Sequence, residues 1–322
     1  MQATDLYSAV KDDFNAVDTA ILEHLSSQVP LVEKISQYII ESGGKRLRPL
    51  LVLLAARACG YSGKHHITLA TVVEFIHTAT LLHDDVVDTS DLRRGRPTAN
   101  HKWGNSSSIL VGDFLYSRAF QLLVSIGQVD VMDTLSSATN VIAEGEVLQL
   151  LNAKNPDVSE ADYLHVILGK TAMLFEAASQ TGAQLAQADK QQTEALRRFG
   201  RHLGIAFQLI DDLMDYAGDE ATMGKKVGDD LAEGKPTLPL IHAMAHASEA
   251  DRKLIRQAIR KGSSEQFETI QGIIRNSGSL DYTRARAAQE TQDALICLDA
   301  LPDSPYKQSL ADLCALALAR QN

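Results

Sequence analysis

The chain has 322 residues, of which 45% are hydrophobic, and its formal net charge is −10 at pH 7. This length and composition allow a large buried core, as one large domain or as two of ordinary size. The acidic balance argues against nucleic acid as a partner, because phosphate binding needs an excess of basic residues. The three cysteines, Cys59, Cys297 and Cys314, lack metal-type or paired spacing, which disfavours a zinc site and a disulfide framework.

The amino terminus carries no pattern typical of a targeting signal. Residues 1–5 are polar, and no basic start followed by an apolar block comes after them, which argues against a signal peptide. The longest apolar stretch, residues 49–56, is much shorter than the roughly 20 residues that a membrane-spanning helix needs. We therefore expect a cytoplasmic protein, in line with the isolated cysteines.

Apolar residues recur mainly at the three- and four-residue spacing of helices, and strand signals are nearly absent. Within residues 69–82, this spacing connects Val72, Val73, Ile76, Ala79 and Thr80. In chain order, the pattern predicts helices at residues 69–82, 109–126, 131–151, 162–185, 194–216, 238–246, 251–261, 264–276, 280–300 and 304–319. No Pro/Gly/Ser-rich linker or tandem repeat separates them. We therefore predict an all-α bundle that forms a single domain over residues 1–322.

Two acidic motifs of the same form end two of these predicted helices: Asp84-Asp85-Val86-Val87-Asp88 and Asp211-Asp212-Leu213-Met214-Asp215. Carboxylates beside apolar runs are costly to desolvate unless a cation neutralises them. On a helix, Asp84 and Asp88 lie one turn apart on one face, so the pair can clamp ions together. Oxygen ligands without cysteine suit Mg²⁺ better than Zn²⁺. The alternative is a solvated acidic helix end, which the repetition of the motif disfavours.

Basic residues occur in short glycine-containing segments that alternate with the acidic motifs along the chain. These segments are GGKRLRP at residues 43–49, RRGR at 93–96, GKT at 169–171 and GKK at 224–226. Glycine-led turns also offer backbone amides to an anion. Each segment taken singly is typical of solvated surface. As a set, they predict a site for magnesium-bridged diphosphates.

Taken together, these segments resemble the motif set of the trans-prenyl diphosphate synthases: LLHDDVVD followed by RRG, GGKRLRP, GKT, QLIDDLMD and GKKVGDDLAEGKPTLPL. The resemblance covers essentially the whole chain. More specifically, the chain resembles the bacterial long-chain enzymes that make the octaprenyl or solanesyl tails of quinones. This resemblance includes AEGEVLQL at residues 143–150 and FQLIDDLMDY at 207–216. It implies an isoprenoid synthase bundle around a deep central cavity, a homodimer and dependence on Mg²⁺.

The resemblance also implies a role for each matching position. Two magnesium ions would be held by Asp84 and Asp88 and a third by Asp211, with Asp85, Asp212 and Asp215 supporting them as further catalytic carboxylates. Isopentenyl diphosphate would bind at Lys45, Arg48, His77 and Arg94. The allylic diphosphate would bind at Arg93, Lys170 and Lys225, with Thr171 and Gln208 beside the reacting carbon. Lys235 is a weaker candidate for closing a lid formed by residues 217–236.

The implied chemistry is electrostatic. Ionisation of an allylic diphosphate produces a carbocation and a highly charged leaving group, so cations must stabilise charge as it develops. The isopentenyl double bond then attacks the carbocation, and the departing diphosphate can accept the proton that is lost. The reaction therefore demands no dedicated side-chain base, and water must be kept from the cation.

Small residues one and two turns before Asp84 favour a long product. Ile76, Ala79 and Thr80 would leave a path below the diphosphate, where aromatic rings would block a growing chain. The alternative is close helix packing by small residues. Further along the path, Leu123, with Phe120 and Leu122, is a candidate to stop elongation.

We therefore expect a Mg²⁺-dependent prenyltransferase that extends farnesyl diphosphate or a similar allylic primer with isopentenyl diphosphate. The expected product is octaprenyl diphosphate for a quinone side chain, with nonaprenyl diphosphate as the alternative and with transient membrane contact during product release. A helical phosphohydrolase using His83 and Asp84 would leave the second acidic motif and GGKRLRP without a role. A terpene cyclase would not need Lys45, Arg48 or Arg94. A non-catalytic subunit of a heteromeric synthase could lose aspartates, whereas this chain keeps both motifs.

Overall fold

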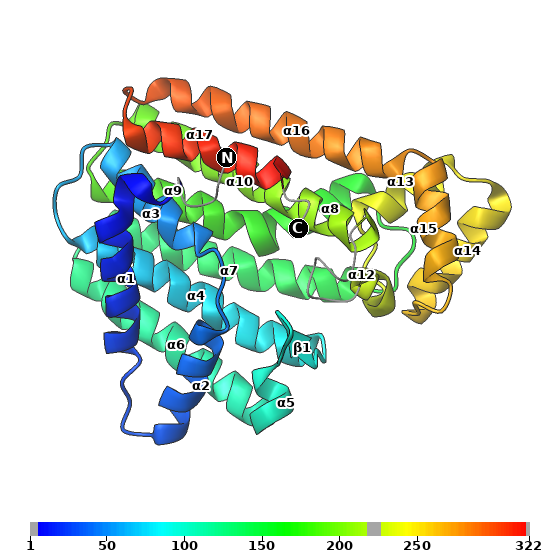
Figure 1. Ribbon diagram of the computed structural model, residues 1–322, viewed down its shortest axis with the longest axis horizontal. Helices are drawn as coiled ribbons and strands as arrows, with labels where there is room; N and C mark the ends of the chain where they lie inside the picture. Colours follow the sequence, from blue (N-terminus) through cyan, green and yellow to red (C-terminus); the bar gives the residue numbers. More distant parts are fainter. Residues whose placement is uncertain (1–5, 218–226, 320–322) are drawn as a thin grey trace. The chain divides into compact units, whose positions relative to one another are not determined.

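The computed structural model describes residues 6–217 and 227–319, and these residues are almost entirely helical (Figure 1). In chain order the elements are η2 (Ser8–Val10), α1 (Lys11–His24), α2 (Pro30–Glu41), α3 (Leu47–Ala58), α4 (His65–Val87), β1 (Leu92–Arg93), β2 (Arg96–Pro97), α5 (Ala99–Trp103), α6 (Asn105–Ile126), α7 (Val129–Asn152), α8 (Glu160–Ile167), η3 (Leu168–Ala172), α9 (Met173–Leu185), α10 (Lys190–Ala217), α12 (Asp229–Glu233), α13 (Leu238–His246), α14 (Glu249–Lys261), α15 (Phe267–Asn276), α16 (Ser279–Cys297), η4 (Leu298–Ala300) and α17 (Pro305–Ala319). The predicted all-α class is confirmed.

The contacts within the chain divide it into two compact units. The first contains residues 1–139, 174–200 and 298–312, and the second contains residues 140–173, 201–297 and 313–322. The helices α7, α10 and α17 contribute residues to both units, and so does α9 through its first residue, Met173. The single domain expected from the sequence stays a prediction.

In the first unit, α4 packs against α1, α3 and α6. Residues 50–56 of α3 are completely buried, as a helix that is apolar on every side requires. Burial in α4 likewise extends around the helix, through Leu69, Phe75 and Ala79, which are fully buried. The first acidic motif is thus the end of a helix held on several sides by core packing.

In the second unit, the end of α10 carries the second acidic motif between two apolar clusters. Leu209, Ile210 and Leu213 pack in one cluster with Leu238 of α13 and Ala287 of α16. The other cluster surrounds Tyr216, which is fully buried, and includes residues of α12, α13, α14 and α15. These clusters hold the last two turns of α10 on both faces.

The structure corrects three of the predicted elements. The predicted helix at residues 162–185 is interrupted, because Leu168–Ala172 forms a π-helical turn. The segment predicted as a lid at 217–236 contains the short helix α12. A two-stranded antiparallel hairpin, β1 with β2, occurs where no strand was predicted. Such short elements depend on single turns and bonds, which hydrophobic periodicity does not report.

Among the described residues, α6 is long and apolar enough to cross a membrane by length and composition. Only 39% of its most apolar window is buried. Core helices of soluble proteins pass the same test, so this finding is weak evidence for a membrane span.

Candidate active site

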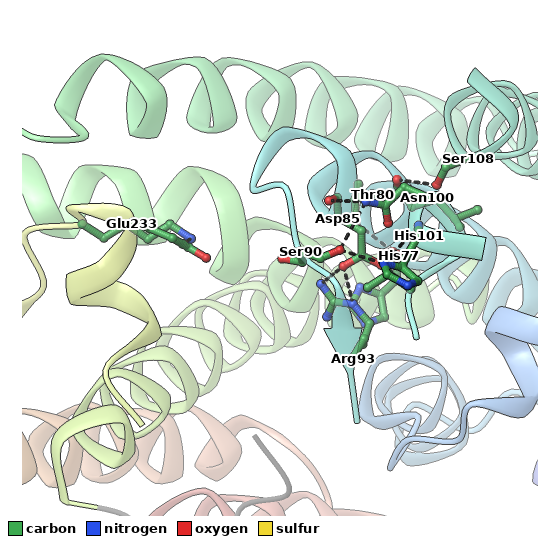
Figure 2. Close-up of polar contacts among 12 residues, drawn as sticks. His77, Thr80, Asp85, Ser90, Arg93, Asn100, His101, Ser108 and Glu233 are labelled. Carbon is green, nitrogen blue, oxygen red and sulfur yellow. Dashed lines mark hydrogen bonds and ion pairs between the residues drawn. The ribbon is translucent and has the colours of Figure 1, made fainter. Parts of the chain in front are cut away.

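The first acidic motif forms the last turn of α4 (Figure 2). Asp88 caps the helix, and its N–H donates to the carbonyl oxygen of Asp84 at 2.8 Å, which keeps the two residues one turn apart. Both side chains are half-buried, whereas Asp85 is completely buried. The motif therefore offers Asp84 and Asp88 toward solvent and turns Asp85 into the protein, as its helical spacing predicts.

Asp85 accepts bonds from Arg93, which the β1–β2 hairpin brings back toward the end of α4 (Figure 2). The Nε and Nη2 atoms of Arg93 lie 2.8 and 2.7 Å from Oδ1 of Asp85. Asn100 of α5 donates to the backbone oxygens of Asp85 and Ser90, both at 3.2 Å. Arg93, which we expected to bind the allylic diphosphate, is thus also a fixed partner of the first acidic motif.

The second acidic motif belongs to a chain of side-chain hydrogen bonds within the second unit. Thr171 donates to Oε1 of Gln208 at 2.8 Å, and Nε2 of Gln208 donates to Oδ1 of Asp212 at 2.6 Å. The other oxygen, Oδ2, accepts the hydroxyl of Tyr163 at 2.5 Å. The structure therefore joins three residues that the motifs singled out, and it adds Tyr163.

Burial has the largest effect on the pKa of Asp212 in this series of hydrogen-bonded side chains. Desolvation raises the pKa of Asp212 to about 7, although Tyr163 and Gln208 donate to its carboxylate and oppose the shift. The neighbouring charges of Asp211 and Asp215 also contribute to this raised pKa. Asp211 is half-buried, so the motif presents it outward while Asp212 and Asp215 lie inside.

Asp215 connects the motif to α12. Its Oδ2 accepts the backbone N–H of Asp230 at 3.1 Å, and its backbone oxygen accepts the N–H of Gly228 at 3.1 Å. Gly228 has a φ of +86°, and a Cβ there would lie 2.5 Å from the ring of Phe267. Glycine is therefore required where the chain returns to the second acidic motif.

Lys170 and Thr171 lie on the π-helical turn, a feature that occurs frequently at functional sites. Nζ of Lys170 lies 2.7 Å from Oε2 of Glu146 on α7. The backbones approach closely here, because a Cβ at Gly145 would lie 2.7 Å from the backbone nitrogen of Lys170. The sequence motif AEGEVLQL had no assigned chemistry. In the structure, Gly145 and Glu146 of this motif hold Lys170 in place.

The loop that contains GGKRLRP leads into α3 and collects the basic groups of the first unit. Arg46 is in the left-handed region, with φ 44°, and begins α3. Nη1 of Arg48 lies 3.2 Å from Nε2 of His77, and its guanidinium stacks 4.5 Å from the ring centre of Phe175. A Cβ at Gly44 would lie 2.7 Å from Nη1 of Arg94, so the glycine admits this guanidinium.

Three of the four residues expected to bind isopentenyl diphosphate therefore have defined positions around this loop. The fourth, Lys45, lies in the loop itself, and its backbone oxygen accepts the hydroxyl of Tyr7 at 2.6 Å. Burial lowers the pKa of His77 well below its ordinary value, and the positive charges of Arg48, Arg94 and Arg93 lower it further. The imidazole is thus neutral at pH 7 and surrounded by fixed cations.

The acidic motifs supply some, but not all, of the ligands that a hard divalent cation needs. Both lie at the carboxyl ends of long helices, where the helix dipole is negative and carboxylates are unfavourable without a cation. Their outward members, Asp84, Asp88 and Asp211, supply only oxygen atoms, which Mg²⁺ prefers. No cluster of three or more His, Cys, Asp or Glu side chains with metal-binding geometry occurs among the residues that the structure describes. Such an ion would therefore also need oxygen atoms of a substrate or of water.

The remaining predicted site residues have mixed outcomes. Lys225 lies outside the described residues, and Lys235 forms an ion pair with Glu233. Of the chain-length candidates, Ile76 and Ala79 are fully buried, Leu123 is 1% exposed and Thr80 is half-buried, so their role stays a prediction. An open hollow of about 700 Å³ between the ends of α6, α7, α9 and α10 is lined by none of the predicted site residues.

Comparisons with known proteins agree with the motifs. The family model described as polyprenyl synthetase matches residues 29–275. The chain is 51% identical over 309 residues to an octaprenyl diphosphate synthase of Escherichia coli (strain K12), covering 96% of each chain. It is also 51% identical over 317 residues to an all-trans-nonaprenyl-diphosphate synthase (geranyl-diphosphate specific) of Rhodobacter capsulatus, covering 98% of this chain and 97% of the relative.

A solved structure shows the same architecture. The polyprenyl synthase from Caulobacter crescentus CB15, complexed with calcium and isoprenyl diphosphate, matches with a TM-score of 0.96 at 42% identity, covering 100% of this chain and 98% of the other. These similarities confirm the resemblance to long-chain trans-prenyl diphosphate synthases. Matched in sequence and in fold over nearly its whole length, the chain belongs to the polyprenyl synthetase family.

Proposed function

We propose that this prenyltransferase uses Mg²⁺ to extend farnesyl diphosphate, or a similar allylic primer, with isopentenyl diphosphate in trans condensations. The proposed product is all-trans octaprenyl diphosphate for a quinone side chain. The observation that carries the proposal is the division within each acidic motif. Asp84, Asp88 and Asp211 are half-buried and accessible to solvent, whereas Asp85 and Asp212 are buried and hydrogen-bonded.

In this proposal, Asp84, Asp88 and Asp211 hold Mg²⁺, which stabilises the charge that develops on the departing diphosphate. Arg93 and Lys170 add fixed positive charge, and their partners Asp85 and Glu146 orient them. Lys225 is proposed as a third cation. Three ions per site with diphosphate bound is our expectation.

Thr171 and Gln208 are proposed to line the path of the reacting carbon. Their hydrogen bond, together with the bond from Gln208 to Asp212, places polar oxygen atoms in a fixed orientation. The lone pairs that these oxygen atoms keep could stabilise a nearby carbocation electrostatically. Asp212 and Asp215 are supporting carboxylates in this scheme.

Isopentenyl diphosphate is proposed to bind at Lys45, Arg48, His77 and Arg94. The neutral imidazole of His77 can donate one hydrogen bond, and the guanidinium groups offer forked donors that match phosphate oxygens. Elongation requires that the double bond of the isopentenyl diphosphate bound here reach the allylic carbon.

Incubation of the pure protein with farnesyl diphosphate, labelled isopentenyl diphosphate and Mg²⁺ tests the proposal. Chromatography of the products should show a forty-carbon chain, with forty-five carbons as the alternative, and EDTA should abolish it. Release of farnesol or phosphate without elongation would instead support a phosphohydrolase. Failure to elongate despite binding both substrates would support a non-catalytic subunit.

Product length is proposed to depend on the small residues near the end of α4. Ala79→Tyr should give shorter products while condensation persists, because a ring would occupy the path below the diphosphate. Ala79 is fully buried, so circular dichroism must first show that the variant is folded. Ala79→Val is a milder second variant that should shift the distribution in the same direction. An unchanged length in both folded variants would refute this explanation.

We also propose that the enzyme is a cytoplasmic homodimer. The outer side of α6 exposes Ile109, Leu110 and Val124, at 41%, 65% and 59% of their surfaces. A row of exposed aliphatic residues on one long helix suits burial against a second copy. Transient membrane contact during release of the apolar product is a further expectation.

A further inference from the structure

Glu74 is a buried carboxylate on α4, one turn before His77, to which the motifs assign no role. It is 8% exposed, and its Oε1 lies 3.8 Å from Nε of Arg46. Burial raises the pKa of Glu74, and the positive charges of Arg46, Arg48 and Arg94 oppose that shift. This carboxyl group therefore lies among the cations proposed to bind isopentenyl diphosphate, and their positive charges favour its ionised form.

Two acidic residues reach Arg46 from different helices, and their contacts differ. Asp18 of α1 forms a direct hydrogen-bonded ion pair with Nη1 of Arg46. Glu74 is too far from Arg46 for a hydrogen bond. Its second oxygen, Oε2, is buried without a hydrogen-bond partner among the residues that the structure describes. Asp18 therefore fixes the position of Arg46, whereas Glu74 contributes mainly its charge.

That charge faces a diphosphate in the proposed reaction. A diphosphate held by Arg48 and Arg94 would be repelled by Glu74, and such repulsion is strong where water is excluded. Each condensation leaves the diphosphate of the isopentenyl unit on the extended chain, so this group must leave its site before the next isopentenyl diphosphate enters. A site lined only by cations would delay that departure.

We propose, on the basis of the proposed function, that Glu74 limits the affinity of the isopentenyl diphosphate site, so that the diphosphate leaves after each condensation. Glu74 is then a residue that sets the turnover of the site and makes no direct contact with substrate. Asp18 has a different role, because it holds Arg46, the cation beside Glu74, in position.

Calorimetric titration with inorganic pyrophosphate in EDTA at pH 8 tests this role without metal or elongation. Glu74→Gln removes the charge and keeps the shape, so it should bind pyrophosphate about three- to tenfold more tightly than the unaltered protein. Glu74→Asp keeps the charge and should bind at nearly the original affinity. Equal or weaker binding by a folded Glu74→Gln variant would overturn the proposal.

Glu176→Gln is the matched control. Glu176 is also 8% exposed, but the cation it pairs with, at 2.6 Å, is Arg197 and not a residue of the basic loop. Its substitution should lower the melting temperature and leave pyrophosphate affinity unchanged. A comparable gain in affinity in this control would show that Glu74→Gln acts through general loosening of the fold, and it would also overturn the proposal.

Steady-state elongation provides a second readout. For Glu74→Gln, both the KM for isopentenyl diphosphate and kcat should fall, because the diphosphate binds more tightly and leaves more slowly. A purely structural role would raise the KM or leave it unchanged, which would contradict the proposal. If the unaltered protein does not elongate at all, the proposed function fails, but the pyrophosphate titration still decides whether Glu74 weakens diphosphate binding.

Discussion

Residues with the same side chain have different environments in this protein. Asp84 is half-buried at the end of α4, whereas its neighbour Asp85 is fully buried and bonded to Arg93. Asp211 and Asp212 repeat this contrast at the end of α10. Helical spacing causes it, because adjacent residues point about 100° apart. Substitution of the outward and the inward aspartates should therefore have different consequences.

Asp84→Asn should lower kcat/KM for elongation by about 10²- to 10³-fold, because a charged metal ligand becomes neutral where charge develops. The melting temperature should remain the same or rise, since a carboxylate is removed from a negative helix end. Asp281→Asn, an exposed position in the first turn of α16, is the control for substitution of an aspartate. Comparable activity in both variants would exclude a catalytic role for Asp84.

His77 should affect the pH dependence of stability. Its folded-state pKa is held well below the ordinary value, so the unfolded chain binds its proton first as the pH falls. The contribution of His77 to stability is therefore complete above about pH 6.5 and is lost as the pH falls toward the folded-state pKa, at up to about 1.4 kcal/mol per pH unit.

Urea unfolding at pH 7.5 and pH 5.5 measures this effect. The unaltered protein should lose more stability between these values than His77→Gln, which has no titrating ring at this position. His101→Gln, which removes an exposed imidazole, is the control for the loss of a histidine. Parallel losses in the unaltered protein and His77→Gln would show that the folded protein also protonates His77 in this range.

At the scale of elements, close backbone contacts place the basic groups. The π-helical turn at Leu168–Ala172 lies against α7, and the contact depends on Gly145 opposite Gly169 and Lys170. Neighbouring elements contact each other here through backbone atoms, which cannot rotate aside. The positions of Lys170 and Thr171 therefore depend on the absence of a side chain on another helix.

Gly145→Ala should disturb this contact, because the added Cβ would lie 2.7 Å from the backbone nitrogen of Lys170. We expect a loss of about 1–3 kcal/mol in the free energy of unfolding, as for an overpacked core, and at least a tenfold loss of kcat/KM. Thermal and urea unfolding, with elongation assays, provide both numbers.

Gly272→Ala is the matched control, because a Cβ there meets no atom within 4 Å and the residue lies inside α15. It should stabilise the protein by about 0.5–1 kcal/mol, as replacement of glycine in a helix does, without changing activity. Equal behaviour of the two variants would mean that the space around Gly145 has no effect on Lys170.

At the scale of the whole molecule, the exposed aliphatic residues of α6 predict the oligomeric state. Leu110→Glu should convert the proposed homodimer into monomers, because a buried interface cannot accept an unpaired charge. Light scattering coupled to size-exclusion chromatography measures the mass. Leu22→Glu alters a leucine of α1 that is 56% exposed and should leave the dimer intact. A monomeric unaltered protein would contradict the proposal directly.

The helical class was predictable because apolar spacing over a long segment is a local property of the sequence. It located α6 and α13 within a few residues and placed both acidic motifs at helix ends. The early helices α1 to α3 were not predicted individually. The apolar residues of α3 surround the helix and leave no periodic pattern, whereas α2 is amphipathic and was nevertheless missed. The π-helical turn was also missed, because it depends on a contact with another helix.

The sequence by itself determined the residue types of the proposed site, their order along the chain, and which aspartates share a helix face. Each of these follows from spacing within one segment. Only the tertiary structure showed that Tyr163 bonds Asp212, that Glu146 holds Lys170 and that Glu74 lies beside Arg46. These pairs lie far apart in the chain, so they meet through core packing, and local periodicity contains no information on which distant helices will touch.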